Sequence, residues 1–442
     1  MIWDTSGNLI GAWRTDGTQV WTGGGEVVMP PLGPDRNVAT MCSAGIIART
    51  PAVANGTYGS TDHALAVDVD GVVLEWVITN GYIAPEEGGV LRAAVQAGDG
   101  PTWTVTFSGS QTHRIDPAAS GGSVVITSDP VPVKASAGEA LNVLAWVDPD
   151  GTGTVPADGT SLLATDPGKG GGAWTVTPSL TPSTDPGGQT SSGGAWTLRP
   201  SRVVAPSDQP AWVAVGDSIV QQTWSWPERA LSARPAVKVG VGGDAYIYYE
   251  SGSAFQNRIG AHLAHADMVL DEFGINDTGT TDDGLVIAAR ALGYWRQVEA
   301  AGVGIVKTTV TLAVSTSDNW ATLEGQTTGA QEPGRVAFNT WLRDGAPLAP
   351  DGTAPVAAGT TQAIRCTTVD AAGTVTVGGE GHPLTAVTDV VAAIESSPDS
   401  GKYALGAPSA AMSGWDDGLH PSPGIHAILG DRLARDLELL GF

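Results

Sequence analysis

The sequence has few charged residues, only two cysteines and no long apolar run. Charged side chains make up 15% of its 442 residues, and 46 acidic against 22 basic side chains give a net charge of −24. A chain this acidic is repelled by nucleic acid and by anionic lipid, so neither is an expected partner. No window reaches the ~18 consecutive apolar residues of a membrane-spanning helix, so membrane insertion is not expected either.

Three further signals are weak or missing. Cys42 and Cys366 are too few for a disulfide framework, and the sequence leaves open whether they are free. His262 and His265 have helix-face spacing but no further ligands beside them, so we predict no metal and no cofactor. The amino-terminal stretch MIWDTSGNLIGAWRTDG lacks the basic start and apolar core of a signal peptide.

The first part of the chain, residues 1–205, carries short runs that are typical of strands. These runs are rich in Val and Thr and are separated by Gly, Pro, Asp and Asn; they span 64–81, 90–98, 102–109, 122–138 and 140–147. The pattern favours an antiparallel β-sandwich or jelly roll. A Gly/Ser/Pro-rich segment at 150–195 predicts loops or a linker. It holds a short repeat, whose copies are GGAWTVTP at 171–178 and GGAWTLRP at 193–200.

From residue 206 onward, strand-like and helix-like runs alternate. The run AWVAVG at 211–216 and the runs at 236–244 and 303–312 read as strands, and the segment 260–277 reads as a helix followed by a strand. Apolar positions at helical spacing predict helices over 284–302, 334–345 and 423–440. This alternation predicts an α/β domain whose parallel sheet is covered on both faces. A β-hairpin is expected as an insertion near 350–385.

Four short blocks in this second part are placed where ligands bind in open α/β sheets, at the carboxyl ends of strands. They read VGDSIV (215–220), VGVGGD (239–244), FGINDTG (273–279) and WDDGLHP (415–421). In this order they resemble the conserved blocks of the SGNH/GDSL hydrolases, over all of 206–442. More loosely, residues 105–147 are similar to the β-rich region that precedes the catalytic domain in one branch of that family.

The resemblance implies an architecture for both parts of the chain. Residues 206–442 are expected to form a flavodoxin-like three-layer α/β/α catalytic domain with a central parallel sheet. Residues 1–205 are expected to form a jelly-roll-like domain that is accessory, anchors the chain or contacts a glycan.

Ser218 is the candidate nucleophile. A serine hydroxyl needs a base to take its proton, and His420 can do this near neutral pH. Asp417 precedes His420 by three residues and can hold the imidazole in the required tautomer. Asp416 is a neighbouring alternative, but the Asp-x-x-His spacing of the family selects Asp417. Val220 replaces the last glycine of Gly-x-Ser-x-Gly, which disfavours the nucleophile elbow of the α/β-hydrolases.

The resemblance also implies an oxyanion hole. Its donors are the backbone N–H groups of Ser218 and Gly243 and the side-chain amide of Asn276, and Gly242 is the alternative to Gly243. Asp217 and Asp277 are expected to brace the loops by hydrogen bonds.

Aromatic residues near the blocks are candidates for lining the substrate site. Trp224 follows the nucleophile and Tyr246 follows the second block. Core packing is the alternative for both, as it is for Trp226, Tyr248 and Tyr249.

The resemblance implies a serine esterase that removes a short acyl group, such as acetyl. Since members of this two-part type often act on carbohydrate esters, it also implies a carbohydrate or cell-envelope glycan as the substrate. The alternative is a structural or receptor-binding protein similar to the minor tail proteins of actinobacterial phages, in which the hydrolase domain binds or trims host glycans. Such a chain would join a virion tail or a homo-oligomer. Both hypotheses favour an extracellular or virion location, and a cytoplasmic one stays open. The sequence does not specify the acyl length, the alcohol or the oligomeric state.

Overall fold

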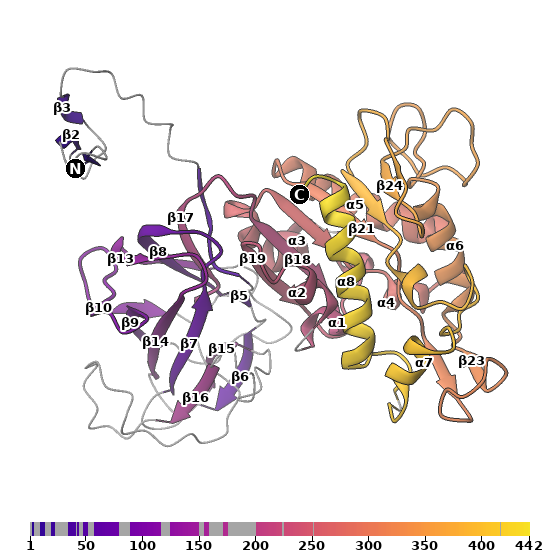
Figure 1. The fold of residues 1–442 in the computed structure, drawn as a ribbon, viewed down its shortest axis with the longest axis horizontal. Helices are drawn as coiled ribbons and strands as arrows, with labels where there is room; N and C mark the ends of the chain where they lie inside the picture. The colour runs from indigo at the N-terminus through magenta and orange to yellow at the C-terminus, as the bar shows by residue number, and fades with distance from the viewer. Residues whose placement is uncertain are drawn as a thin grey trace.

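The chain forms an antiparallel β region followed by an α/β region in this computed structural model (Figure 1). The structure describes residues 34–40, 57–78, 89–115, 124–149, 200–222, 225–250, 252–415 and 417–442, and short strands at 2–3, 9–13, 19–22, 42–43, 47–51, 154–158 and 171–175. The α/β class predicted for the chain is confirmed by its mixture of sheets and helices.

The β region contains two larger sheets in which all pairs are antiparallel. The first has the order β10-β9-β14-β7-β16 with β11 also paired to β9, and the second has the order β12-β8-β17-β4 with β13 also paired to β8. Their bounds are β4 Asp35–Asn37, β7 Thr57–Ala64, β8 Val69–Ile78, β9 Gly89–Ala97, β10 Thr102–Thr104, β11 His113–Ile115, β12 Val124–Thr127, β13 Val131–Ala135, β14 Ala140–Pro149, β16 Gly171–Thr175 and β17 Arg202–Pro206. In β13, buried and exposed residues alternate, as expected for a strand with one face in the core.

The segment 150–195 differs from its prediction as loops or a linker. It contributes β15 (Thr154–Asp158), which pairs with β6 (Ile47–Pro51), and β16, the first copy of the short repeat. Val155 and Trp174 of this segment lie in strands because the segment pairs with strands distant in the sequence, and local composition does not reveal such partners. The second copy begins outside the described residues. Three further strands, β1 (Ile2–Trp3), β2 (Leu9–Trp13) and β3 (Gln19–Thr22), pair with one another.

The α/β region is built on a sheet of order β25-β24-β26-β21-β20-β18-β19-β5. All neighbours in it are parallel except β25, which pairs antiparallel with β24. The bounds are β5 Cys42–Ser43, β18 Trp212–Gly216, β19 Ala236–Gly240, β20 Met268–Asp271, β21 Gly304–Thr308, β24 Thr367–Val369, β25 Val375–Thr376 and β26 Ala386–Thr388. Every residue of β18, β19 and β20 is buried, which fits a sheet covered on both faces.

Helices connect these strands. They are α1 Ser218–Gln221, α2 Trp226–Ala230, α3 Gly252–Arg258, α4 Ile275–Thr278, α5 Gly284–Ala300, α6 Glu332–Arg343, α7 Ala407–Met412 and α8 Pro423–Leu439, with 3₁₀ turns η2 Tyr246–Tyr249, η3 Gly260–His265 and η4 Val391–Ala393 and a small hairpin of β22 Val314–Thr316 and β23 Gln326–Thr328. The helix predicted just before β20 is thus the 3₁₀ turn η3. Among the described residues, no helix has the length and apolar character needed to span a membrane.

The two regions are joined by strand pairing and by charged contacts. β5 comes from the amino-terminal part of the chain but lies beside β19 at the edge of the parallel sheet. Arg202 of β17 donates to the Ala261 carbonyl at 2.8 Å and pairs with buried Glu75, while Arg36 of β4 pairs with Asp267. The sheet of the second region is therefore completed by the first.

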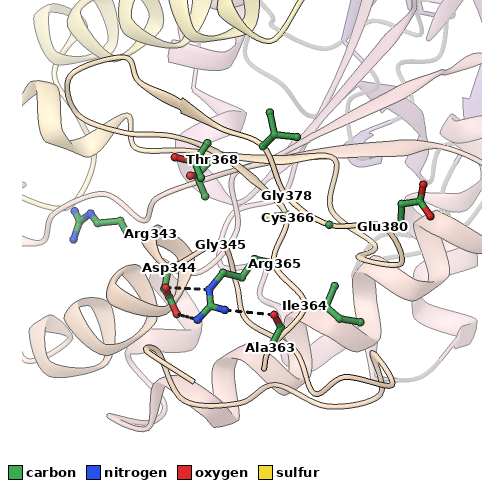
Figure 2. A pocket seen from close by; sticks show the side chains of 13 residues that line it. Arg343, Asp344, Gly345, Ala363, Ile364, Arg365, Cys366, Thr368, Gly378 and Glu380 are labelled. Carbon is green, nitrogen blue, oxygen red and sulfur yellow. Dashed lines mark hydrogen bonds and ion pairs between the residues drawn. The ribbon is translucent and has the colours of Figure 1, made fainter. Parts of the chain in front are cut away.

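The insertion expected near 350–385 contains the antiparallel strands β24 and β25. A pocket of about 500 Å³ opens between these strands and the carboxyl end of α6 (Figure 2). Inside it, the guanidinium of Arg365 donates to both carboxylate oxygens of Asp344. Cys366 lines the same pocket as a buried free thiol. The pocket lies at the amino end of β24, whereas Ser218 follows the carboxyl end of β18.

Candidate active site

The ends of three adjacent strands place the first three blocks at one edge of the sheet. β18 ends at Gly216, β19 at Gly240 and β20 at Asp271. The first two blocks begin on the last two residues of β18 and β19, and the third begins two residues after β20. Since neighbouring strands run parallel, these carboxyl ends lie side by side. The fourth block lies between α7 and α8.

Ser218 opens the short helix α1, and Asp217 caps it. The Asp217 carboxylate accepts a hydrogen bond from the backbone N–H of Ile219 at 2.9 Å. Gly216 is required in front of it, because a Cβ there would lie 2.3 Å from Val220 Cγ2 and 2.6 Å from Glu272 Oε2. The strand therefore turns sharply into the helix, and the serine lies at the sheet edge.

Ser218, His420 and Asp417 form one hydrogen-bonded chain. His420 Nε2 lies 2.7 Å from Ser218 Oγ, and His420 Nδ1 lies 2.6 Å from Asp417 Oδ2. Asp417 Oδ1 also accepts from the backbone N–H of Leu419, which fixes the turn that carries the carboxylate. Gly418 lets this turn pass close to β22, since a Cβ there would lie 1.9 Å from the Val314 carbonyl oxygen. Asp416, the neighbouring alternative, lies outside the described residues.

This group of residues is close to the surface. The side chain of His420 is 25% exposed and that of Asp417 is 45% exposed. Partial burial alone would raise the pKa of Asp417, but hydrogen bonds from His420 and the backbone lower it below its ordinary value. The carboxylate is thus ionised at neutral pH and can stabilise a positive imidazolium.

Backbone N–H groups suited to bind an oxyanion lie beside Ser218. Within the described ranges, the N–H groups of Ser218, Gly242 and Gly243 donate to no other group. A Cβ on Gly242 would lie 3.9 Å from Ser218 Cβ, and Gly243 has φ +76°, a conformation that favours glycine. Both glycines are therefore candidates for the second backbone donor.

The side-chain amide of Asn276 is already occupied. Its Nδ2 donates to Asp217 Oδ2 at 3.1 Å and to the backbone carbonyl of Asp244 at 2.8 Å. An amide nitrogen carries two hydrogens, so both are used in this state. Asp277, beside it, accepts from the backbone N–H groups of Tyr246 and Ile247.

Several carboxyl groups are buried behind the candidate nucleophile. Burial raises the pKa of Asp217 to about 7 and the pKa values of Asp244 and Asp277 to about 6. Burial and the charge of Asp217 also raise the pKa of Glu272 well above its ordinary value. Glu272 Oε2 has no hydrogen-bond partner among the described residues. Lys307 of β21, the strand beside β20, is fully buried and donates to the carbonyls of Asp271 and Phe273.

Trp224 and Tyr246 are the two candidates for lining the substrate site, and the structure describes only Tyr246. Tyr246 is 0% exposed, and its hydroxyl donates to Asp271 at 2.7 Å, so it packs in the core below the site. A fully buried ring that already has a polar partner is not available to a substrate. Trp224 lies outside the described residues, whereas Trp226 is buried. Of the tyrosines in η2, Tyr248 is 47% exposed and Tyr249 is buried.

Sequence reasoning gave no role to two residues that hold the site. The Asp244 carboxylate pairs with Arg258 at 2.7 Å and accepts from the Tyr249 hydroxyl, while its carbonyl holds Asn276. His426 of α8 contacts the segment after the nucleophile. Asp244 is the last residue of the block VGVGGD, so the sequence pattern indicates that it lies near the site, but no sequence pattern marks His426. Within the described part of the chain, no three His, Cys, Asp or Glu side chains are grouped to hold a metal ion.

No family model and no curated protein matches the chain. Among solved structures it is similar to a salicylyl-acyltransferase from a tetracycline biosynthetic pathway, with 14% identity over 87% of this chain and 82% of that chain and a TM-score of 0.30. It is also similar to a proposed acylhydrolase from Bacteroides fragilis (13% identity, 53% and 89% of the two chains, TM-score 0.34). A peptidoglycan O-acetylesterase matches with 11% identity over 71% and 77% and a TM-score of 0.21. At these values the likenesses assign no function, which has to come from the site.

Proposed function

We propose that this chain is a serine esterase of the SGNH/GDSL type. The observation that carries the proposal is the chain of hydrogen bonds from Asp417 through His420 to Ser218, with distances of 2.6 and 2.7 Å. The strand order β19-β18-β20-β21-β26 corresponds to the order 2-1-3-4-5 and supports a flavodoxin-like three-layer domain. Residues 1–205 then act as an accessory β domain.

In the first half of the reaction, Ser218 Oγ attacks the carbonyl carbon of the ester while His420 Nε2 takes the hydroxyl proton. Asp417 stabilises the imidazolium that forms. The backbone N–H groups of Ser218 and of Gly243, or its neighbour Gly242, donate to the oxyanion, joined by the Asn276 amide. When the tetrahedral intermediate collapses, the C–O bond to the alcohol breaks, and His420 returns the proton to the departing oxygen.

In the second half, water replaces the alcohol. His420 takes a proton from the water as its oxygen attacks the acyl carbon, and the bond to Ser218 Oγ then breaks. The proton returns to Ser218, and the carboxylic acid leaves. No cofactor enters either half of this scheme.

We propose that the substrate is a short acyl ester, such as acetyl, on a carbohydrate or cell-envelope glycan. The exposure of His420 and Asp417 supports this class, because a site near the surface can accept a bulky alcohol. The exposed backbone at Gly242 and Gly243 leaves little depth for a long acyl chain.

The nucleophile can be tested with two serine variants. Ser218→Ala should abolish hydrolysis of p-nitrophenyl acetate and labelling by a fluorophosphonate. Ser225→Ala is the matched control, since this nearby serine is fully buried and its hydroxyl has no partner among the described residues. Turnover that survives in Ser218→Ala would reject the assignment.

The substrate class can be tested by supplying acetylated glycans and triglycerides to the same enzyme. Release of acetate from a glycan, dependent on Ser218, is the expected result. Faster release of fatty acids from triglycerides would reject the carbohydrate proposal and leave the esterase proposal intact.

A further inference from the structure

His426 links the helix that follows His420 to the segment that follows Ser218. It lies in α8, is 2% exposed and uses both ring nitrogens. Its Nδ1 lies 3.0 Å from the backbone nitrogen of Trp226, and its Nε2 lies 2.6 Å from Gln222 Oε1. Neither contact belongs to the hydrogen-bonded chain of Ser218, His420 and Asp417.

The partners of His426 determine its tautomer. The Trp226 backbone N–H is a donor, so Nδ1 accepts and carries no proton. The proton of the neutral ring is therefore on Nε2, which donates to the side-chain oxygen of Gln222. Burial, together with the nearby charge of Lys238, lowers the pKa of His426 to about 3. The ring is thus neutral, and the direction of both hydrogen bonds is fixed.

Gln222 is itself fastened to the nucleophile helix. Its backbone N–H donates to the Ser218 carbonyl at 3.2 Å, and its own carbonyl accepts from Lys238 Nζ at 3.0 Å. Lys238 also pairs with Glu228 at 2.9 Å. Gln222 therefore has little freedom to follow a movement of α8 without moving α1.

His420 is only a few residues from the helix that carries His426. Ser422 follows His420 by two residues and caps α8 by accepting from the backbone N–H of Ile425. His426 lies in the first turns of that helix. The same two segments are thus connected twice, once through Ser218 and His420 and once through Gln222 and His426.

We propose that His426 is a positioning residue that sets the approach of His420 Nε2 to Ser218 Oγ by tying α8 to the end of α1. The inference rests on the proposed esterase function and goes beyond it, because His426 touches neither the ester nor the reacting atoms. Misplacement of reacting groups by about 1 Å can cost roughly 10²-fold in rate. Loss of this link is therefore expected to lower kcat more than it raises KM.

Two variants remove the link in different ways. In His426→Asn the shorter amide oxygen can still accept from Trp226 N–H but cannot reach Gln222, and in Gln222→Met the partner of Nε2 is removed from a half-buried site. Each should lower kcat for p-nitrophenyl acetate by about 10- to 100-fold with KM nearly unchanged. The double variant should be no slower than the worse single variant, because both changes break one link.

His262→Asn is the matched control. His262 is also 2% exposed, and burial likewise lowers its pKa to about 3. It lies in η3, next to the amino end of β20 and so at the opposite edge of the sheet from Ser218. Its replacement should lower the melting temperature, because it leaves a cavity at a buried site, and leave kcat unchanged.

Fluorophosphonate labelling separates this inference from the function on which it rests. We expect the wild type to be labelled at Ser218. At temperatures well below their melting temperatures, His426→Asn and Gln222→Met should be labelled about 10- to 100-fold more slowly. Equal labelling rates in wild type and both variants would overturn the positioning role alone, as would a loss of kcat in His262→Asn matching that of His426→Asn. A wild type that is neither labelled nor active would overturn the function and the positioning role together.

Discussion

The Asn276 amide and the Asp217 carboxylate are joined by a hydrogen bond of 3.1 Å. The second amide hydrogen is held by the Asp244 carbonyl, so an oxyanion can receive one only in exchange. Asp217 is the partner whose loss is tolerated more easily, because its bond is the longer one and its carboxylate keeps the N–H of Ile219. Under the proposed mechanism, the contribution of Asn276 to the transition state is therefore its hydrogen bond to the oxyanion less the cost of losing the bond to Asp217.

Replacement of Asn276 by Ala should lower kcat by at most roughly 10²–10³-fold, the usual cost of one oxyanion donor, because the exchange with Asp217 reduces its contribution. Steady-state kinetics with p-nitrophenyl acetate measure it, and the KM should stay within about twofold of the wild type because the interaction forms mainly in the transition state. Asn319→Ala is the control, since Asn319 bonds Ser413 and Gly414 instead. A loss of less than threefold in Asn276→Ala would remove it from the oxyanion hole.

Replacement of Asp417 by Asn should lower kcat by about 10³–10⁴-fold. The amide can present an N–H to His420 Nδ1, which favours the tautomer that cannot accept the Ser218 proton. The folded state should be little changed, because the side chain is 45% exposed. Near-normal turnover in Asp417→Asn would shift the role to Asp416, and Asp416→Asn tests that directly.

The buried carboxyl of Asp217 should make stability fall as pH rises. Its pKa is about 7 in the folded chain against an ordinary 3.8, so the folded state binds more protons than the unfolded state between these values. Stability from this group is complete below about pH 4 and is lost as pH rises towards 7 and above. Asp217→Asn should therefore gain stability relative to the wild type between pH 4.5 and 8, measured by urea unfolding. Asp282→Asn, at an exposed site, should follow the wild type; a constant difference for Asp217→Asn would contradict the argument.

Glu75 should show the opposite pH dependence. Burial alone raises its pKa, but the hydrogen bond with His265 and the charge of Arg202 together lower it to about 2. Its contribution is present above the ordinary pKa near 4.5 and disappears as pH falls towards 2. Glu75→Gln should cost about 3–5 kcal/mol of unfolding free energy at pH 6, since it removes the carboxylate that neutralises the buried charge of Arg202, and much less at pH 3.

The control for Glu75 is the exposed ion pair between Asp70 and Lys134, whose side chains are 75% and 76% exposed. Asp70→Asn should change the unfolding free energy by less than about 1 kcal/mol at either pH. If the two variants changed the unfolding free energy alike, the buried pair of Glu75 and Arg202 inside the β region would contribute no more to stability than an exposed pair.

The position of the candidate site could be predicted because it depends on local order in the sequence. VAVGDS, VKVGVGG and VLDEFGIND each combine a buried strand with small or polar residues, and parallel pairing then places these residues at one edge. The spacing of Asp417 and His420 within one turn is equally local. The contact of His420 with Ser218 across 202 residues follows only from the resemblance to a known set of blocks.

Long-range pairings and burial are not encoded in local sequence patterns. Tyr246 follows the second block just as a substrate-contacting residue could, but the tertiary fold turns it towards Asp271 and Trp295 in the core. Likewise, β15 and β16 lie in a glycine-rich segment, and their partners β6 and β7 are distant in the chain. The two bonds of Asn276 depend on side-chain directions that no spacing encodes.

The strand β5 has a consequence for any attempt to produce residues 206–442 by themselves. Without it, the backbone N–H and C=O groups of β19 on that side would face water as an open template for another chain. A shortened protein of this kind should self-associate or aggregate at concentrations where the whole chain stays dispersed, even if its hydrolytic centre were intact. Pairing with β5 thus covers the edge of β19 that could otherwise pair with the sheet of another molecule.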